Sequence, residues 1–316
     1  PNPQNVTHWL AAQFPTDNRA PHRKYYAVSI HDNAHNLPPE LLAAALAAYP
    51  EGHAKHRSVI LGQRGVNVTG VPVYKGLFSR AAHIGTTVYD PQSPILVALD
   101  YGKHHPCVVL AQQPRWGGLH LLGGILGQDM FLDDFLPMVQ QQIATWFPVT
   151  AGVQVCCDPA GSHQNSQGAR FNGVDLVRRA GWLPSWRDNA NAPDVRAGCI
   201  EAIGAHMRRR TPTGEAFLCE ADPAKWLLVS MEGPKHEPFL ADALEAGYVW
   251  DANMVSVGNK QIRKPKKDGW FEHGMNCSEY LELTFGADRP TADARARREA
   301  AERETTAPYR PASAWG

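Results

Sequence analysis

Two aspartates of this chain, Asp100 and Asp158, each close an apolar run of strand length. The runs are Ile95-Leu-Val-Ala-Leu-Asp100 and Val153-Gln-Val-Cys-Cys-Asp158, and a glycine follows each run closely. A buried carboxylate without a partner is costly, so such an aspartate serves as a turn residue or as a ligand. If the two strands are neighbours in one sheet, the carboxylates lie together. Their oxygens then suit the hard cations Mg²⁺ and Mn²⁺.

The composition is that of a globular protein without a charge bias. The 316 residues suffice for one large domain or two ordinary ones. A hydrophobic fraction of 43% allows a sizeable core. The 31 Lys and Arg residues balance the 31 Asp and Glu residues. The net charge therefore does not point to nucleic acid as a partner, although it is compatible with a local basic groove.

The cysteines and the apolar runs indicate the cellular context. Six cysteines occur without a C-x-x-C pair, which favours a reducing, intracellular environment and no structural zinc. Cys156 and Cys157 are neighbours in an expected strand, so their side chains should point to opposite faces. No apolar run approaches the ~18 residues of a membrane span, and no signal peptide is recognisable. We therefore expect no membrane contact.

The segments around the two aspartates predict a mixed α/β sheet. Three strands with short connections, which favour an antiparallel meander, are expected at residues 95–101, 107–112 and 119–122. Helical periodicity over residues 129–147, with Pro137 inside, then leads to a strand at 153–158. A parallel strand reached by such a crossover lies beside the first strand. This is a ribonuclease H-like layout, flanked by helices, and it places Asp100 beside Asp158.

Further elements are expected on both sides of this unit. Helices are predicted at residues 36–49, 173–181, 194–210, 222–231, 237–246 and 272–285. Short strands and turns are predicted at residues 57–62, 71–78, 215–219 and 248–250. Residues 260–267 read as a basic loop. Opposite charges four residues apart predict an exposed helix at 290–304, followed by a flexible tail.

Four stretches of the chain carry a family resemblance. They are Leu99-Asp-Tyr-Gly-Lys-His-His-Pro106, Asp158-Pro-Ala-Gly161, Glu272-His-Gly-Met-Asn-Cys-Ser-Glu-Tyr280, and the segment from Gly62 to Phe78. Together they resemble the C-terminal nuclease half of the large terminase subunit of tailed bacteriophages, the motor that packages and cuts viral DNA. The resemblance covers about residues 20–286.

The resemblance implies a domain organisation. Residues 1–90 would be the tail of an ATPase domain with a linker, residues 91–287 the ribonuclease H-like nuclease domain, and residues 288–316 an exposed helix with a flexible tail. The sequence contains no G-x-x-x-x-G-K-[ST] motif, so we expect no ATPase activity from this chain alone. Since the chain begins with Pro rather than Met, we expect a fragment or a split protein.

The resemblance also implies two-metal phosphodiester hydrolysis with Mg²⁺ or Mn²⁺. Two ions about 4 Å apart activate the attacking oxygen and stabilise the leaving oxygen. Asp100 would bridge both ions, Asp158 would hold one, and the closing helix would hold the other. The family has a third Asp where this chain has Asn276, which brings a carbonyl oxygen but no charge. Glu279 and His273 are the alternative ligands. If none of the three residues binds a metal ion, they form part of a polar helix surface.

The implied substrate is double-stranded DNA. Two basic groups are expected to contact phosphates in a sequence-independent way. They are Lys260, Arg263, Lys264, Lys266 and Lys267 in the basic loop, and Arg208, Arg209 and Arg210 at the end of a helix. The alternative for both groups is a solvated loop and a basic helix C-terminus, which suits the helix dipole.

The expected function is therefore that of a metal-dependent endonuclease that cuts concatemeric viral DNA. One alternative is a catalytically weak docking module that binds DNA or the portal, and another is a Holliday-junction resolvase. The resemblance implies the portal protein and a small terminase subunit as further partners, and residues 290–316 are where we expect portal contact. The expected location is the host cell cytoplasm, at the procapsid portal during packaging, and not the mature virion.

Overall fold

The computed structural model of the chain describes most residues between 24 and 286. The described residues are 24, 26–50, 55–63, 70–102, 104–114, 117–158, 161, 172–187, 189–212, 214–230 and 233–286. The side chain of Lys260 and the expected helix and tail at 288–316 lie outside this description.

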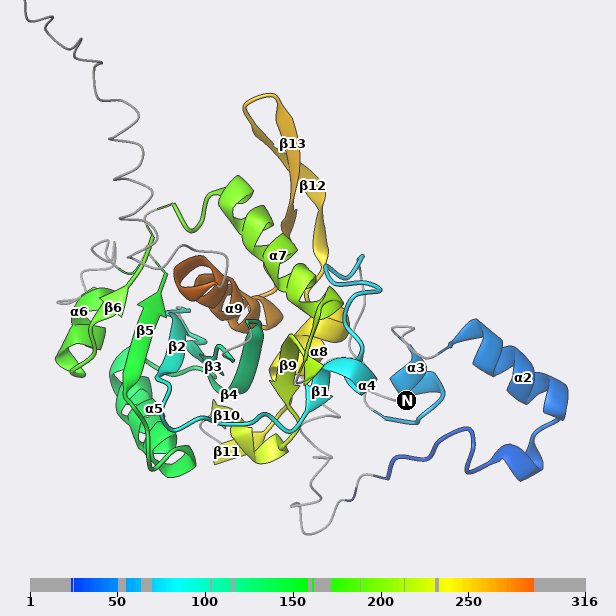
Figure 1. Cartoon of the computed structure of the whole chain (residues 1–316). Helices are drawn as coiled ribbons and strands as arrows, with labels where there is room; N and C mark the ends of the chain where they lie inside the picture. Colours follow the sequence, from blue (N-terminus) through cyan, green and yellow to red (C-terminus); the bar gives the residue numbers. More distant parts are fainter. Residues whose placement is uncertain are drawn as a thin grey trace, which may run out of the picture.

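A mixed β-sheet forms the centre of the protein (Figure 1). Nine strands, counted over the described residues, belong to it in the order β1-β9-β4-β3-β2-β5-β6, with β10 on β4 and β11 on β10. Their bounds are β1 Ile84–Gly85, β2 Ile95–Asp100, β3 Cys107–Gln112, β4 Leu119–Gly127, β5 Val153–Cys157, β6 Pro184–Ser185, β9 Phe217–Glu220, β10 Trp226–Ser230 and β11 Gly233–His236.

The strand order confirms the predicted ribonuclease H-like layout. β2, β3 and β4 form an antiparallel meander, and β5 returns parallel to β2. Every residue of β2 and of β3 is buried. This near-continuous burial follows from helices on both faces of the sheet, which leave no solvated side.

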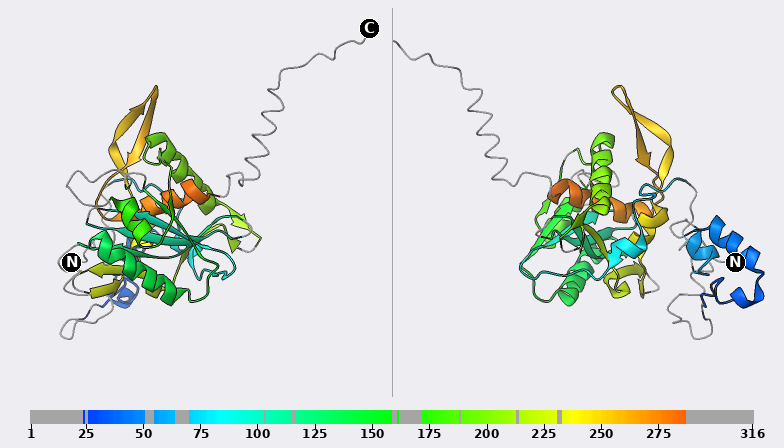
Figure 2. Two further views of the ribbon diagram at one scale, coloured as in Figure 1. Left: turned by 90° about the vertical axis from the view of Figure 1, so that its left-hand side faces the viewer. Right: turned by 45° about the vertical axis from the view of Figure 1, so that its right-hand side comes forward.

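Helices cover both faces of the sheet. The α-helices of the described residues are α2 Pro39–Ala48, α3 His56–Val59, α4 Arg80–His83, α5 Leu132–Trp146, α6 Gly173–Arg179, α7 Pro193–Arg208, α8 Phe239–Asp242 and α9 Phe271–Phe285; α2 and α3 lie away from the sheet (Figure 1). Two 3₁₀ turns, Ala34–Asn36 and Pro223–Lys225, and a π-helical turn, Ala243–Gly247, complete the set among the described residues. Helices α5 and α6 lie on one face of the sheet, and α7, α8 and α9 lie on the other (Figure 2). Apolar side chains of each group pack against the face that the group covers. Cys156 faces the α9 side and Cys157 the α5 side, as the alternation predicts.

The helix predicted at residues 222–231 is wrong. Asp222 and Pro223 are typical of a helix start, and the Asp222 side chain does accept a hydrogen bond from the Ala224 N–H. The helix ends after one 3₁₀ turn, because the apolar run that follows becomes β10 and pairs in parallel with β4. The tertiary pairing outweighs the local signal.

Two further predictions are wrong. Residues 260–265 form a strand rather than a loop, and the short strand predicted at 248–250 begins and ends later in the chain. β12, Trp250–Val257, and β13, Lys260–Pro265, form a hairpin that projects from the body (Figure 1). Gly258 and Asn259 connect them, and Gly258 has a φ of 57°, which a tight hairpin turn requires. The apolar and polar residues alternate in Val255-Ser256-Val257 and are followed by Gly-Asn, a pattern that is typical of a strand entering a hairpin turn.

Two shorter segments also differ from prediction. Residues 56–59, expected as extended chain, form α3. The helix predicted to reach residue 210 ends at Arg208, and Arg210–Thr211 pairs as β7 with β8, Gly214–Glu215.

The segment before β2 packs on the body formed by the central sheet and its helices. Tyr74 is 2% exposed within the core on the α9 face, and β1 pairs in parallel with β9. The domain boundary at residue 90 stays a prediction. Within the described residues, none of the helices has the length and hydropathy that a membrane crossing requires.

Candidate active site

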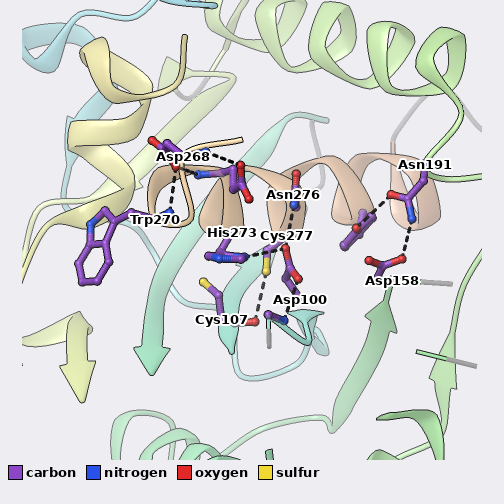
Figure 3. A network of polar contacts seen from close by, with 12 residues as sticks. Asp100, Cys107, Asp158, Asn191, Asp268, Trp270, His273, Asn276 and Cys277 are labelled. Atoms are coloured by element: carbon purple, nitrogen blue, oxygen red, sulfur yellow. Dashed lines mark hydrogen bonds and ion pairs between the residues drawn. The ribbon is translucent and has the colours of Figure 1, made fainter. Parts of the chain in front are cut away.

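The carboxyl ends of β2 and β5 bring Asp100 and Asp158 to the same edge of the sheet. Leu99 pairs with Cys157, and the Asp158 N–H extends this ladder by donating to the Leu99 carbonyl at 3.3 Å. Both aspartates therefore occupy equivalent positions one residue further on. Side chains alternate along a strand, so both carboxylates point to the face that α9 covers (Figure 3).

Asp100 is only 6% exposed, and its carboxylate accepts hydrogen bonds on both oxygens. The Gly102 N–H donates to Oδ1 at 3.1 Å. On Oδ2, Asn276 Nδ2 donates at 2.8 Å and His273 Nδ1 lies at 3.3 Å. Both of these side chains come from α9. The closing helix thus fixes the orientation of Asp100.

The partners of Asp100 also set its charge. Burial opposes ionisation, but the hydrogen bonds from His273, Asn276 and the Gly102 amide outweigh it, so the pKa of Asp100 lies below its ordinary value. Burial likewise opposes protonation of His273, yet the hydrogen bond and charge of Asp100 raise the pKa of His273 above its ordinary value. The two groups therefore favour an ionised Asp100 beside a protonated His273.

Asp158 is held by a second amide. Asn191 Nδ2 donates to Asp158 Oδ1 at 2.8 Å, and Tyr280 donates its hydroxyl to Asn191 Oδ1 at 3.4 Å. Burial raises the pKa of Tyr280, and the negative charges of Asp100 and Asp158 raise it further. Tyr280 of α9 thus lies within the electrostatic reach of both carboxylates.

Asn276 is held from behind by Arg196 of α7. Arg196 Nη2 donates to Asn276 Oδ1 at 2.6 Å, while the Asn276 amide nitrogen faces Asp100. The distances form one chain from Arg196 through Asn276 to Asp100. The orientation of the amide follows from it, because a guanidinium only donates and a carboxylate only accepts.

Glu279 shares Arg196 with Asn276 but, among the described residues, makes no hydrogen bond to Asp100. It is 2% exposed, and its Oε2 accepts from Arg196 Nε at 2.8 Å. The Tyr248 hydroxyl donates to its Oε1 in a short hydrogen bond. Burial raises the pKa of Glu279, and the charge and hydrogen bond of Arg196 offset part of this rise. Both Glu279 oxygens thus have protein donors.

The structure gathers four of the expected site residues around one carboxylate edge: Asp100, Asp158, Asn276 and His273. Glu279 lies on the same helix but binds Arg196 instead. Arg196 and Asn191 were missed, because both act through contacts more than thirty residues away in sequence and no local pattern marks them. The expected DNA contacts are not part of this cluster.

The atoms that could coordinate a metal ion determine which ions would suit the site. Among the described residues, no group of three or more His, Cys, Asp or Glu side chains is arranged to hold a metal ion. The two carboxylates at matching strand ends are hard oxygen donors of the kind that Mg²⁺ and Mn²⁺ prefer. The chemistry of the residues therefore fits such ions, with less ligand charge than three acidic residues would supply.

Two glycines make room for the ring of Tyr101 next to the site. Tyr101, which follows Asp100, lies between Gly161 and Gly173. A Cβ atom at Gly161 would lie 2.0 Å from Tyr101 Cε2, and one at Gly173 would lie 2.6 Å from Tyr101 Cε1. Residue 161 must therefore be a glycine, because any side chain there would overlap the ring of Tyr101.

Gly161→Ala should destabilise the protein by about 1–3 kcal/mol, since a tightly packed ring must move. Urea unfolding of the full chain measures this. The matched control is Gly198→Ala in α7, where an added Cβ meets no atom within 4 Å and alanine favours the helix. Equal stability of the two variants would contradict the packing role of Gly161.

No protein-family model matches the chain, and no curated protein matches it either. Solved structures that are similar to it include the large terminase of a thermophilic bacteriophage in complex with ADP. The identity is 16% and the TM-score 0.45, over 90% of this chain and 61% of that chain. The large terminase of bacteriophage HK97 is similar with 12% identity and a TM-score of 0.39, over 78% of this chain and 51% of that chain. The chain thus spans 61% and 51% of the lengths of these two proteins.

Proposed function

We propose that the chain is a metal-dependent DNA endonuclease of a viral packaging motor, which cuts concatemeric double-stranded DNA. One observation carries the proposal: Asp100 and Asp158 stand at matching ends of adjacent parallel strands, and α9 fixes Asp100 through Asn276 and His273. A ribonuclease H-like sheet with such carboxylates is a frame for phosphodiester hydrolysis. The sequence motifs at residues 99–106 and 158–161 agree with it.

Each residue has a defined task in this proposal. Asp100 and Asp158 would hold two Mg²⁺ or Mn²⁺ ions. Such ions activate a water for attack on the phosphate and stabilise the charge on the leaving oxygen. Asn276 and His273 keep Asp100 oriented, and Asn191 does the same for Asp158.

The β12–β13 hairpin is the proposed DNA-holding element. The side chains of Arg263, Lys264, Lys266 and Lys267 are exposed on β13 and the residues after it. Arg208, Arg209 and Arg210 are also exposed at the end of α7, but Arg210 is paired with Glu215 at 3.0 Å. The hairpin therefore offers the more available positive charge for phosphates.

Neutralising three basic side chains of β13 and the residues after it should weaken DNA binding and flatten its dependence on salt by about 3 units in log–log slope, since each lost phosphate contact removes about 0.9. The variant is Arg263→Gln with Lys264→Gln and Lys267→Gln. The control removes the same charges elsewhere on the surface, with Arg187→Gln, Lys24→Gln and Lys75→Gln. Fluorescence anisotropy with a duplex at several salt concentrations compares them, and identical slopes would contradict the hairpin's role.

The proposal includes the partners and place that the motor implies. Double-stranded DNA, the portal protein and a small terminase subunit would bind the assembled motor at the procapsid portal in the host cell cytoplasm. The proposed portal contact is residues 290–316. Deleting these residues should leave DNA cutting intact and weaken portal binding, and unchanged portal binding would contradict this part.

A docking module that holds DNA without cutting it is the second candidate. The observation in its favour is Asn276, an amide where a third acidic ligand is expected, together with Glu279, whose oxygens both have protein donors. Nicking of a supercoiled plasmid by the full chain in Mn²⁺, Mg²⁺ or EDTA separates the candidates. Metal-dependent nicking supports the endonuclease. DNA binding without nicking in either metal supports the docking module.

A further inference from the structure

The Asn276 amide has one permitted orientation. Its Oδ1 must face Arg196, which only donates, and its Nδ2 must face Asp100, which accepts when ionised. A rotated amide would place its NH₂ group against the guanidinium and its oxygen against the carboxylate. Both contacts would then be repulsive. Asn276 is therefore held as a donor to Asp100.

Arg196 is itself fixed, so it acts as the positioning residue for Asn276. Its Nε donates to Glu279 at 2.8 Å, and its Nη2 lies 3.2 Å from the Tyr248 hydroxyl. The side chains of Arg196 and Glu279 are 18% and 3% exposed. The partly buried, paired guanidinium keeps one place, because moving it would leave Glu279 as an unpaired buried charge.

The second carboxylate also has an amide partner, although Asn191 is exposed. Asn191 donates its NH₂ group to Asp158, and the Tyr280 hydroxyl donates to the Asn191 oxygen. Each aspartate of the site thus accepts a hydrogen bond from an amide whose oxygen is bound by a donor. Both carboxylates are stabilised by the protein itself, which lowers their need for a cation.

The charge of the site also indicates that the protein alone binds divalent ions weakly. Arg196 neutralises Glu279, so the carboxylates that the described part of the chain offers a cation at this edge are Asp100 and Asp158, with two negative charges together. Two divalent ions carry four positive charges. A phosphate of bound DNA adds negative charge and hard oxygen atoms at this place.

We propose that the Asn276 and Asn191 amides, with Arg196 as the residue that orients Asn276, make metal loading dependent on bound DNA. This inference rests on the proposed function and specifies its regulation. The free chain keeps its carboxylates hydrogen-bonded and binds divalent ions weakly. Bound DNA supplies the missing ligand charge, so metal and DNA each strengthen the binding of the other by the same factor.

Electron paramagnetic resonance of free Mn²⁺ tests this with the full chain, without DNA and with a short duplex, against a titration of the duplex alone. For the unmodified chain, we expect the duplex to tighten Mn²⁺ binding at least about tenfold. Asn276→Asp places a second carboxylate next to that of Asp100, and a bound cation would relieve the repulsion between the two. It should bind Mn²⁺ at least about tenfold more tightly without DNA and lose most of the dependence on DNA.

The control and a second variant keep the result decisive. Asn36→Asp adds the same charge at an exposed position outside the site and should behave as the unmodified chain. Asn191→Asp tests the second amide, with the same expectation as Asn276→Asp, should the latter fail to fold. Tight Mn²⁺ binding by the unmodified chain without DNA would overturn the inference, as would unaltered Mn²⁺ binding in a folded Asn276→Asp or Asn191→Asp variant.

Plasmid nicking separates this inference from the proposed function. Metal-dependent nicking without any coupling between Mn²⁺ and DNA contradicts the inference and leaves the endonuclease standing. Coupling without nicking supports the inference about loading and contradicts the endonuclease.

Discussion

Asp100→Asn should lower metal-dependent plasmid nicking at least about a thousandfold, because several kcal/mol of transition-state stabilisation depend on the ligand charge. Asparagine has the size of aspartate, so the packing of β2 is retained. What is lost is the charge that faces α9 at the end of β2. Initial nicking rates in Mn²⁺, at equal protein concentration, measure the effect.

Stability must be measured alongside, since Asp100 accepts hydrogen bonds from Asn276, His273 and Gly102. An amide at residue 100 turns a donor toward some of these donors and should cost about 1–3 kcal/mol. Assays well below the melting temperature of the variant exclude unfolding as the cause. Asp133→Asn, at an exposed position in α5, is the matched control and should nick at the unmodified rate. A folded Asp100→Asn variant that nicks equally fast would remove Asp100 from the site.

Arg196→Met should destabilise the protein by about 3–5 kcal/mol, because it leaves Glu279 as a buried charge without its ion-pair partner. The double variant with Glu279→Leu should recover most of this loss, since two apolar side chains replace a buried pair at little cost. Urea unfolding of the single and double variants gives the coupling between the two residues.

The chain contains a matched exposed pair for comparison. Arg210 Nε lies 3.0 Å from Glu215 Oε1, but the Arg210 side chain is 78% exposed. Arg210→Met should therefore change stability by less than about 1 kcal/mol. If Arg196→Met cost no more than Arg210→Met, Arg196 would not be an essential partner of Glu279.

The strands that carry the aspartates were predictable, because each has apolar residues over the length of a strand; β2 is buried throughout, and β5 is buried from Val155 to Cys157. Ile95 to Leu99 and Val153 to Cys157 have this pattern, and a helical segment between them implied the parallel return. β10 was not predictable in the same way. Its Trp-Leu-Leu-Val run follows Asp222 and Pro223, and a short apolar run does not separate a buried strand from a helix.

The candidate site was predictable only in part. Helical spacing placed His273, Asn276 and Glu279 near one another, and the structure shows that the first two contact Asp100. Spacing could not show that Glu279 is tied to Arg196, eighty-three residues earlier in the chain. A buried ion pair depends on how α7 crosses α9, and that crossing leaves no periodic trace in either helix.

The most direct test of the proposed metal site is the position of Mn²⁺ in crystals of the full chain with a short duplex DNA, located by anomalous scattering. This measurement ties the ion to individual residues, which a nicking assay does not. We expect manganese peaks within coordination distance of carboxylate oxygens of both Asp100 and Asp158, with a DNA phosphate beside them. Manganese bound only elsewhere, with Asp100 and Asp158 still bonded to Asn276 and Asn191 beside the bound duplex, would contradict the assignment of this site.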